Sequence, residues 1–154
     1  MCVNQIKIKM PIKPKGFTLI EVLLSVALIA VLFGISIPVF SPALLKNDLE
    51  SSADLTVQSL RRAQVLSQTV QNDSQWGIKV QNYGVVLFRG NSFSDRDTAF
   101  DEFTDFPTNI DINDTDEFVF EKLTGRTTGP GNITLTLKEY SKIISVNSMG
   151  AVEY

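Results

Sequence analysis

The stretch FTLIEVLLSVALIAVLFGISIPVF, residues 17–40, decides how this chain is built. It is a run of 24 residues with a single charged side chain, Glu21. As an α-helix rising about 1.5 Å per residue it would be roughly 36 Å long, and the hydrocarbon core of a bilayer is about 30 Å thick. We therefore predict that residues 17–40 form a transmembrane helix.

The charges on the two sides of this run differ in sign. The first 16 residues contain four lysines and no acid, whereas the residues after them contain ten basic and seventeen acidic side chains. Positively charged flanks stay in the cytoplasm. The pattern predicts a single-pass protein with its N-terminus in the cytoplasm and its C-terminal domain on the other side of the membrane.

The apolar run is not followed by the cleavage site of an ordinary secretory signal. Such a signal is cut after its apolar region, at small residues. Residues 38–46 read PVFSPALLK and offer no such site. The pattern favours a processing site before the run, between Gly16 and Phe17.

Residues 15–21, KGFTLIE, carry a resemblance to a known family. They lie between a basic leader and an apolar run, and they resemble the motif that prepilin peptidase recognises in type IV pilins and pseudopilins. The resemblance implies that residues 1–16 are a leader cut off after Gly16, and that Phe17 becomes an N-methylated N-terminus. Translation from Met10 in place of Met1 would give the shorter leader MPIKPKG, and both starts remain open.

Glu21 has two compatible interpretations. The spacing Thr18-x-x-Glu21 is that of a helix capping box, and an acid in the first turn suits the helix dipole. The family resemblance implies an assembly role, in which Glu21 faces the free amine of Phe17 on a neighbouring subunit and positions it.

Further along the run, Gly34 and Pro38 predict a kink, and Ser41-Pro42 predicts a new helix start.

The remaining chain predicts an α+β fold: a long N-terminal α-helix, transmembrane in its first half, packed on a small antiparallel β-sheet domain. Residues 41–71 continue the helix with an amphipathic pattern, and residues 72–154 form the β domain outside the membrane. The predicted buried helix face comprises Leu45, Leu49, Ala53, Leu60, Ala63 and Val70, with Val57 alongside.

The predicted strands are short runs rich in β-forming residues between turn residues, and the run at 118–123 alternates cleanly. Residues 75–80 and 85–89 predict a hairpin around Asn82-Tyr83-Gly84, and we expect Trp76 as a core residue or an interface anchor. Further strands are predicted at 118–123, 133–137, 143–146 and 151–154. Residues 59–68, 131–137 and 144–152 are similar, more loosely, to H-type minor pseudopilins of type II secretion and to Fim-T-like minor pilins.

The segment 91–117 is rich in acids and phenylalanines. It predicts a long surface excursion pinned by Phe93, Phe100, Phe103 and Phe106, with a strand at 109–112. Clustered carboxylates at 95–117 also suit Ca²⁺, but the segment lacks the glycine and spacing of an EF-hand loop. We predict no cofactor and leave calcium binding as the alternative.

The resemblance implies a structural minor pseudopilin or prepilin, assembled into a type II secretion pseudopilus or a type IV pilus. Its implied location is the bacterial inner (cytoplasmic) membrane and then the filament. The implied partners are prepilin peptidase, other pilin or pseudopilin subunits, the inner-membrane assembly platform and the lipid bilayer. The sequence leaves open the choice among secretion, pilus and competence machines, and between tip and shaft.

The alternative function is a DNA-binding minor pilin for DNA uptake. DNA binding needs a basic surface, and the chain after residue 16 is acidic. Fim-T-like proteins that bind DNA use a basic C-terminal motif, whereas this chain ends SMGAVEY and has Arg126 alone earlier. We expect no nucleic-acid partner. We also predict no enzyme, because the chain has no histidine, no phosphate-binding loop and only Cys2, in the leader.

Overall fold

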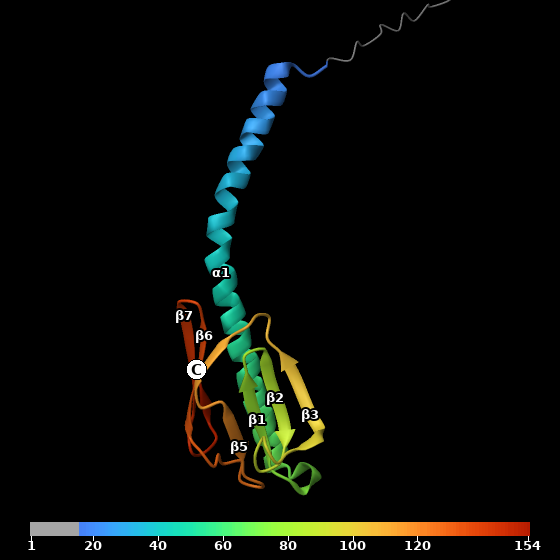
Figure 1. The fold of residues 1–154 in the computed structure, drawn as a ribbon, viewed down its shortest axis with the longest axis vertical. Helices are drawn as coiled ribbons and strands as arrows, with labels where there is room; N and C mark the ends of the chain where they lie inside the picture. Colours follow the sequence, from blue (N-terminus) through green and yellow to red (C-terminus); the bar gives the residue numbers. More distant parts are fainter. Residues whose placement is uncertain (1–15) are drawn as a thin grey trace, which may run out of the picture. The chain divides into compact units, whose positions relative to one another are not determined.

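The computed structural model describes residues 16–154, apart from the side chains of residues 34–41. One long helix is followed by two antiparallel sheets, so the predicted α+β class is confirmed (Figure 1). The chain divides into two compact units, Met1–Val39 and Phe40–Tyr154, which are described separately below.

The helix α1 (Leu19–Gln68) is continuous. The predicted new helix start at Ser41-Pro42 is wrong, because the backbone is helical throughout residues 34–42. A proline removes one backbone donor, and the hydrogen bonds of the neighbouring turns carry the helix past it. Gly34 and Pro38 belong to the stretch whose side chains lie outside the described part, and the kink stays a prediction.

The helix ends at Gln68, short of the predicted boundary at Gln71. Val70 adopts a left-handed backbone conformation with φ 55°, which a β-branched residue rarely takes within regular structure. The chain then makes a single 3₁₀ turn, η1 (Gln71–Asp73), before the first strand. An ion pair between Lys122 and Asp73 connects η1 to the turn that follows β5.

The first sheet, sheet A, has the strand order β3-β2-β1-β5 and is antiparallel throughout. Its strands are β1 (Trp76–Gln81), β2 (Gly84–Arg89), β3 (Asp97–Asp105) and β5 (Glu117–Phe120). The predicted hairpin is confirmed as β1 and β2, joined by Asn82-Tyr83. The predicted strand at 118–123 is shorter, because the chain turns after Phe120.

The acidic segment 91–117 is not the surface excursion that the sequence predicted, since its middle forms β3 at the edge of sheet A. In β3, Glu102 and Thr104 lie opposite Leu87 and Val85, so they share the face that points to the core. Because acidic residues are disfavoured in strands, the alternation of side chains along residues 97–105 was not interpreted as a strand. Pairing with the buried strand β2 overrides that preference.

The second sheet, sheet B, has the strand order β4-β6-β7-β8. Its strands are β4 (Asp111–Asp114), β6 (Gly131–Leu137), β7 (Tyr140–Val146) and β8 (Val152–Glu153). They correspond to the predicted strands at 109–112, 133–137, 143–146 and 151–154, with shifted ends. The domain thus holds two four-stranded sheets, where the pattern predicted one small sheet.

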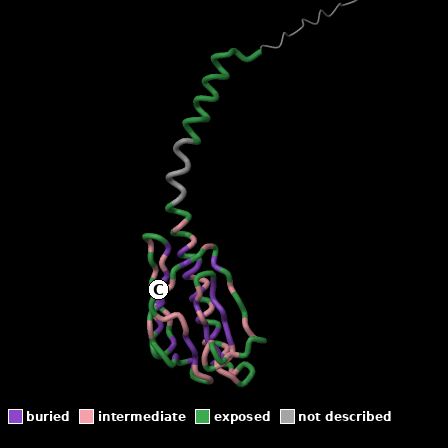
Figure 2. The backbone as a smooth tube through the Cα atoms, in the orientation of Figure 1, coloured by how far each residue is buried: buried purple, intermediate pink, exposed green. Residues whose placement is uncertain are grey.

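The two sheets and the second half of α1 enclose one core, shown as the buried stretches in Figure 2. The predicted helix face is largely confirmed, since Leu49, Ala53, Val57, Leu60 and Ala63 are all buried. The two ends of that face, Leu45 and Val70, are only half-buried. Small buried residues let the helix approach closely, and the hydroxyls of Ser52 and Thr56 donate to helix carbonyls one turn earlier.

Trp76 lies in the core, as predicted, with 4% of its surface exposed. Its indole N–H donates to the carbonyl of Gln71 at 3.0 Å, and its backbone N–H donates to the Ser67 hydroxyl at 3.0 Å. Both polar groups of this buried residue are therefore satisfied by the end of α1 and η1.

Sheet B contacts α1 through polar pairs at the margin of the core. Lys142 lies 3.6 Å from the carboxylate of Glu50. The Asp54 carboxylate, hydrogen-bonded to the Tyr154 hydroxyl, raises the pKa of that hydroxyl. The first pair joins β7 to the helix, and the second brings Tyr154, the last residue of the sequence, against it.

We expect the substitution Gly84→Ala to loosen the edge of sheet A. A Cβ at Gly84 would lie 2.2 Å from the carbonyl oxygen of Thr104, so β3 would have to move. Overpacking of this kind lowers the free energy of unfolding by about 1–3 kcal/mol. Urea unfolding of the purified chain measures this loss of stability. Gly129→Ala is the control, since a Cβ at Gly129 meets nothing within 4 Å. Equal midpoints for the two variants would contradict this expectation.

Candidate functional site: the N-terminal turn and the exposed apolar helix

The predicted processing site lies in exposed, non-helical backbone. Gly16 is the first described residue, and neither it nor Phe17 is part of α1. The Phe17 side chain is 83% exposed. A Cβ at Gly16 would meet nothing within 4 Å, so packing gives no reason for glycine there. The peptide bond between the two residues is thus open to an enzyme, although cleavage itself stays a prediction.

The helix begins with half of the predicted capping box. The Glu21 backbone N–H donates to the Thr18 carbonyl at 3.1 Å and also lies 3.4 Å from the Thr18 hydroxyl oxygen. Within residues 16–154, the Glu21 carboxylate does not return a bond to the Thr18 N–H and has no cationic partner. Among residues 16–154 this cap therefore leaves the Glu21 carboxylate unpaired, and its role in assembly stays a prediction.

The first turns of α1 are apolar on every side. From Phe17 to Phe33 the large apolar side chains are each more than half exposed. A helix that is apolar all round is normally covered by lipid or by other chains. This segment therefore needs a covering that the described residues of the chain do not supply.

Among the residues that the structure describes, no helix combines the length and the apolar character that crossing a membrane requires. The predicted leader, residues 1–16, lies outside the described residues except for Gly16.

Residues 13–37 match the family model of the prokaryotic N-terminal methylation motif. This match supports a type IV pilin-like protein. It includes the predicted cleavage site, the predicted N-methylated Phe17, and Glu21. None of the curated proteins or solved structures compared with the chain matches it. The type IV pilin-like motif thus ends before the β domain begins, and the looser resemblance to H-type and Fim-T-like proteins stays a prediction.

The acids of segment 95–117 lie on strands β3, β4 and β5 and in the connections beside them, and several are paired with bases. Asp97 lies 2.6 Å from Arg89, Asp101 lies 2.8 Å from Arg96, and Asp116 lies 2.8 Å from Lys79. Residues 16–154 contain no group of three or more acidic, cysteine or histidine side chains placed to hold a metal ion. The absence of a cofactor and the calcium alternative both stay predictions.

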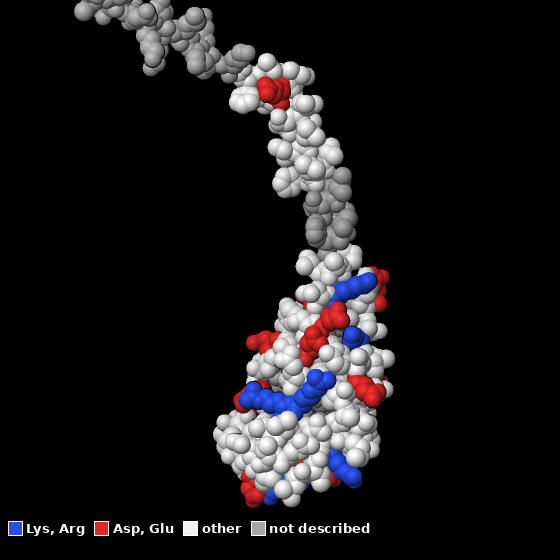
Figure 3. Space-filling view, turned by 180° about the vertical axis from the view of Figure 1, so that it is seen from behind, with Lys and Arg blue, Asp and Glu red and all other residues white. Residues whose placement is uncertain are grey.

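The surface gives little support to the DNA-binding alternative. On the face shown in Figure 3, basic and acidic side chains are interspersed, without a continuous basic area. Arg126 lies exposed on the connection between β5 and β6. A protein that neutralises several phosphates needs its bases gathered on one surface.

The local sequence pattern did not predict the ion pair of Arg62 on α1 with Glu102 on β3, which is one of several ion pairs between distant elements. Had residues 97–105 been treated as a strand, alternation would have placed Glu102 on the side that faces the helix.

Proposed function

We propose that this chain is a prepilin-type structural subunit. Prepilin peptidase removes the leader after Gly16, and Phe17 is then N-methylated. Residues 17–40 hold the subunit in the bacterial inner membrane until it joins other subunits at an inner-membrane assembly platform. The observation that carries the proposal is the methylation-motif match over residues 13–37, which contains an exposed Gly16-Phe17 bond.

Glu21 acts in assembly under this proposal. Its carboxylate lies in a helical turn surrounded by exposed apolar side chains, which become poorly solvated once lipid or neighbouring helices cover them. An unpaired charge is then costly, and a cation of opposite sign offsets much of that cost. The amine of Phe17 on a neighbouring subunit supplies this cation and fixes the register of the two helices.

We further propose a minor pseudopilin of a type II secretion pseudopilus, or a minor pilin of a type IV pilus. The looser similarities of residues 59–68 and of the C-terminal strands to H-type and Fim-T-like proteins support this narrower assignment. The proposal does not extend to DNA uptake, because the acidic chain and its interspersed surface charges do not favour phosphate binding.

The substitution Gly16→Ala tests the proposal. Co-expression with a prepilin peptidase is expected to yield a mature chain that begins with N-methyl-Phe17, and the variant is expected to stay uncut. Since a Cβ at Gly16 meets nothing within 4 Å, loss of cleavage would report recognition and not misfolding. Mass spectrometry of the intact chain and its N-terminal peptide distinguishes the products.

Gly129→Ala is the matched control, because it changes a glycine outside the motif that is equally free of neighbours. It should be cut like the unchanged chain. An unchanged chain that remains whole beside an active peptidase, or a cut after residue 40, would overturn the proposed function.

A further inference from the structure

All four edge strands of the two sheets are acidic. The edges of sheet A are β3 and β5, and those of sheet B are β4 and β8. Each of these strands carries at least one carboxylate, and none carries a lysine or an arginine. Like charges directly opposite one another destabilise a strand pair. Edge-to-edge pairing between two copies of this chain is therefore disfavoured.

The edge strand β3 differs from the other three in length. It has nine residues, against four in β4, four in β5 and two in β8. Within residues 16–154 it pairs only with β2, so its outer edge is free. The pairing is regular from Glu102 to Asp105, and the register shift of the strand lies before this part. These four residues of β3 thus form a regularly paired edge to which another short strand can be added.

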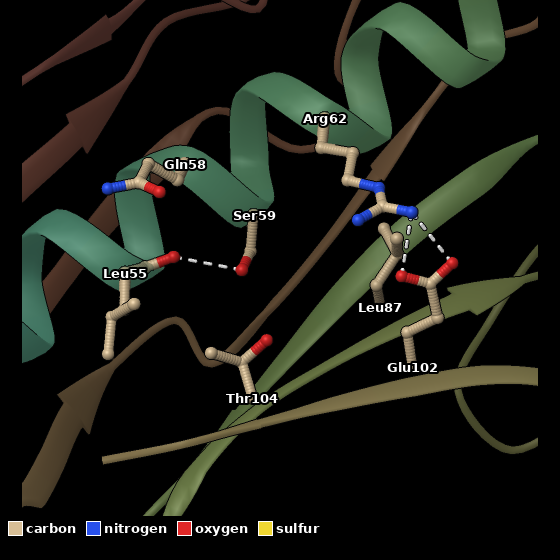
Figure 4. A pocket seen from close by; sticks show the side chains of 7 residues that line it. All are labelled: Leu55, Gln58, Ser59, Arg62, Leu87, Glu102 and Thr104. Atoms are coloured by element: carbon tan, nitrogen blue, oxygen red, sulfur yellow. Dashed lines mark hydrogen bonds and ion pairs between the residues drawn. The ribbon is translucent and has the colours of Figure 1, made fainter. Parts of the chain in front are cut away.

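A pocket of about 130 Å³ lies beside this part of β3, on the side that faces the helix (Figure 4). Leu55, Gln58, Ser59 and Arg62 of α1 line one side of it, and Glu102 and Thr104 of β3 line the other, with Leu87 of β2. Two leucines make part of the lining apolar, and the remaining lining is polar. This volume is far above the roughly 10–15 Å³ that a single water molecule needs, so the pocket can admit one side chain of a partner.

The Arg62–Glu102 ion pair lies across one end of the pocket (Figure 4). Arg62 Nη2 lies 2.8 Å from both carboxylate oxygens of Glu102. The two side chains are 58% and 50% exposed. An exposed pair of this kind contributes little to stability, so a second cation can replace Arg62 at the carboxylate at small cost.

We propose that β3 and this pocket bind an extended segment of another polypeptide that carries lysine or arginine. The segment adds as a strand to the free edge of β3, and alternate side chains point towards α1. Three of the four carboxylates of β3 already face an arginine of this chain, whereas Asp105 has no such partner among residues 16–154. Asp105, and Glu102 once Arg62 is displaced, select a strand with cationic side chains. One cation pairs with Glu102 and takes the place that Arg62 otherwise occupies. This inference does not depend on cleavage after Gly16.

Substitutions of the two residues of the ion pair are expected to change peptide binding in opposite directions. The probe is a fluorescent nonapeptide, Thr-Val-Thr-Val-Lys-Val-Thr-Val-Thr, titrated into the full-length chain in detergent micelles. Arg62→Gln frees Glu102 and is expected to tighten binding, whereas Glu102→Gln removes the acceptor and is expected to weaken it. Each effect should reach up to about fivefold in Kd, the scale of one exposed charge pair. Glu139→Gln, in the turn before β7, is the control and should leave Kd unchanged.

A purely structural ion pair would behave differently, because removing either partner would then have the same effect. Shifts of Kd in the same direction for both variants would overturn the proposal, as would equal binding of a peptide with glutamate in place of the lysine. The absence of saturable binding to the unchanged chain would also overturn it.

Strand addition is tested with two N-methylated peptides, each methylated at one of the two alternating sets of amides. Only the set that faces β3 donates hydrogen bonds to it. One peptide is expected to lose binding and the other to retain it. Equal behaviour of the two peptides would rule out strand addition along β3.

Discussion

The substitution Glu21→Gln is expected to abolish incorporation of the chain into filaments while cleavage after Gly16 continues. Glutamine keeps the length and shape of the side chain and removes the charge that the proposed Phe17 amine would meet. That amine would then be left unpaired among apolar helices. Breaking a buried ion pair in this way costs about 3–5 kcal/mol, which corresponds to a more than hundredfold loss of assembly affinity.

The measurement is the amount of processed chain in sheared filaments from cells that express the assembly machinery. Glu139→Gln is the matched control, because it removes the same charge from an exposed turn of the β domain. Glu21→Asp keeps the charge on a shorter side chain and should restore part of the assembly. Filament incorporation of Glu21→Gln at the level of the unchanged chain would show that the carboxylate acts only as a helix cap.

The substitution Leu60→Ala is expected to destabilise the β domain by about 2–5 kcal/mol. Leu60 is fully buried on the face of α1 that packs against both sheets, so its loss leaves a cavity in the shared core. Small domains have a total stability of about 5–15 kcal/mol. The change therefore removes a large share of the free energy of unfolding.

Urea unfolding followed by the fluorescence of Trp76, the single tryptophan of the chain, measures this effect. Val65→Ala on the same helix is the matched control, because Val65 is 53% exposed and its truncation leaves no cavity. The expected result is a large shift of the midpoint for Leu60→Ala and a small shift for Val65→Ala. Similar shifts for both would mean that α1 does not pack on the sheets through the buried face described above.

Local patterns predicted much of the domain correctly. The spacing of Leu49, Ala53, Leu60 and Ala63 identified the buried face of α1, because residues three and four apart share one side of a helix. The hairpin of β1 and β2 was also predicted, since two short β-rich runs surround a turn that ends at Gly84. In both cases neighbouring residues alone set the pattern.

Non-local pairing accounts for most of the errors. The segment 97–105 has the composition of an acidic loop, and it forms a strand only because the buried strand β2 pairs with it. Likewise, nothing in the local patterns assigns β4 to a different sheet from β3 and β5. The partner of each strand is far away in the sequence, and local propensity for strand formation depends on that partner.

The amino-acid sequence by itself pointed to the features of residues 1–40: the lysines of the first 16 residues, the motif around Gly16 and Phe17, the apolar run with Glu21, and the resulting prepilin-type interpretation. These features act through composition and consecutive residues, which a sequence displays directly. Only the tertiary structure decided that Arg62 reaches Glu102, and that a pocket lies beside the outer edge of β3, which pairs with no other strand among residues 16–154. Those relations depend on which distant segments the core brings together, because burial of apolar faces, and not sequence proximity, fixes their positions.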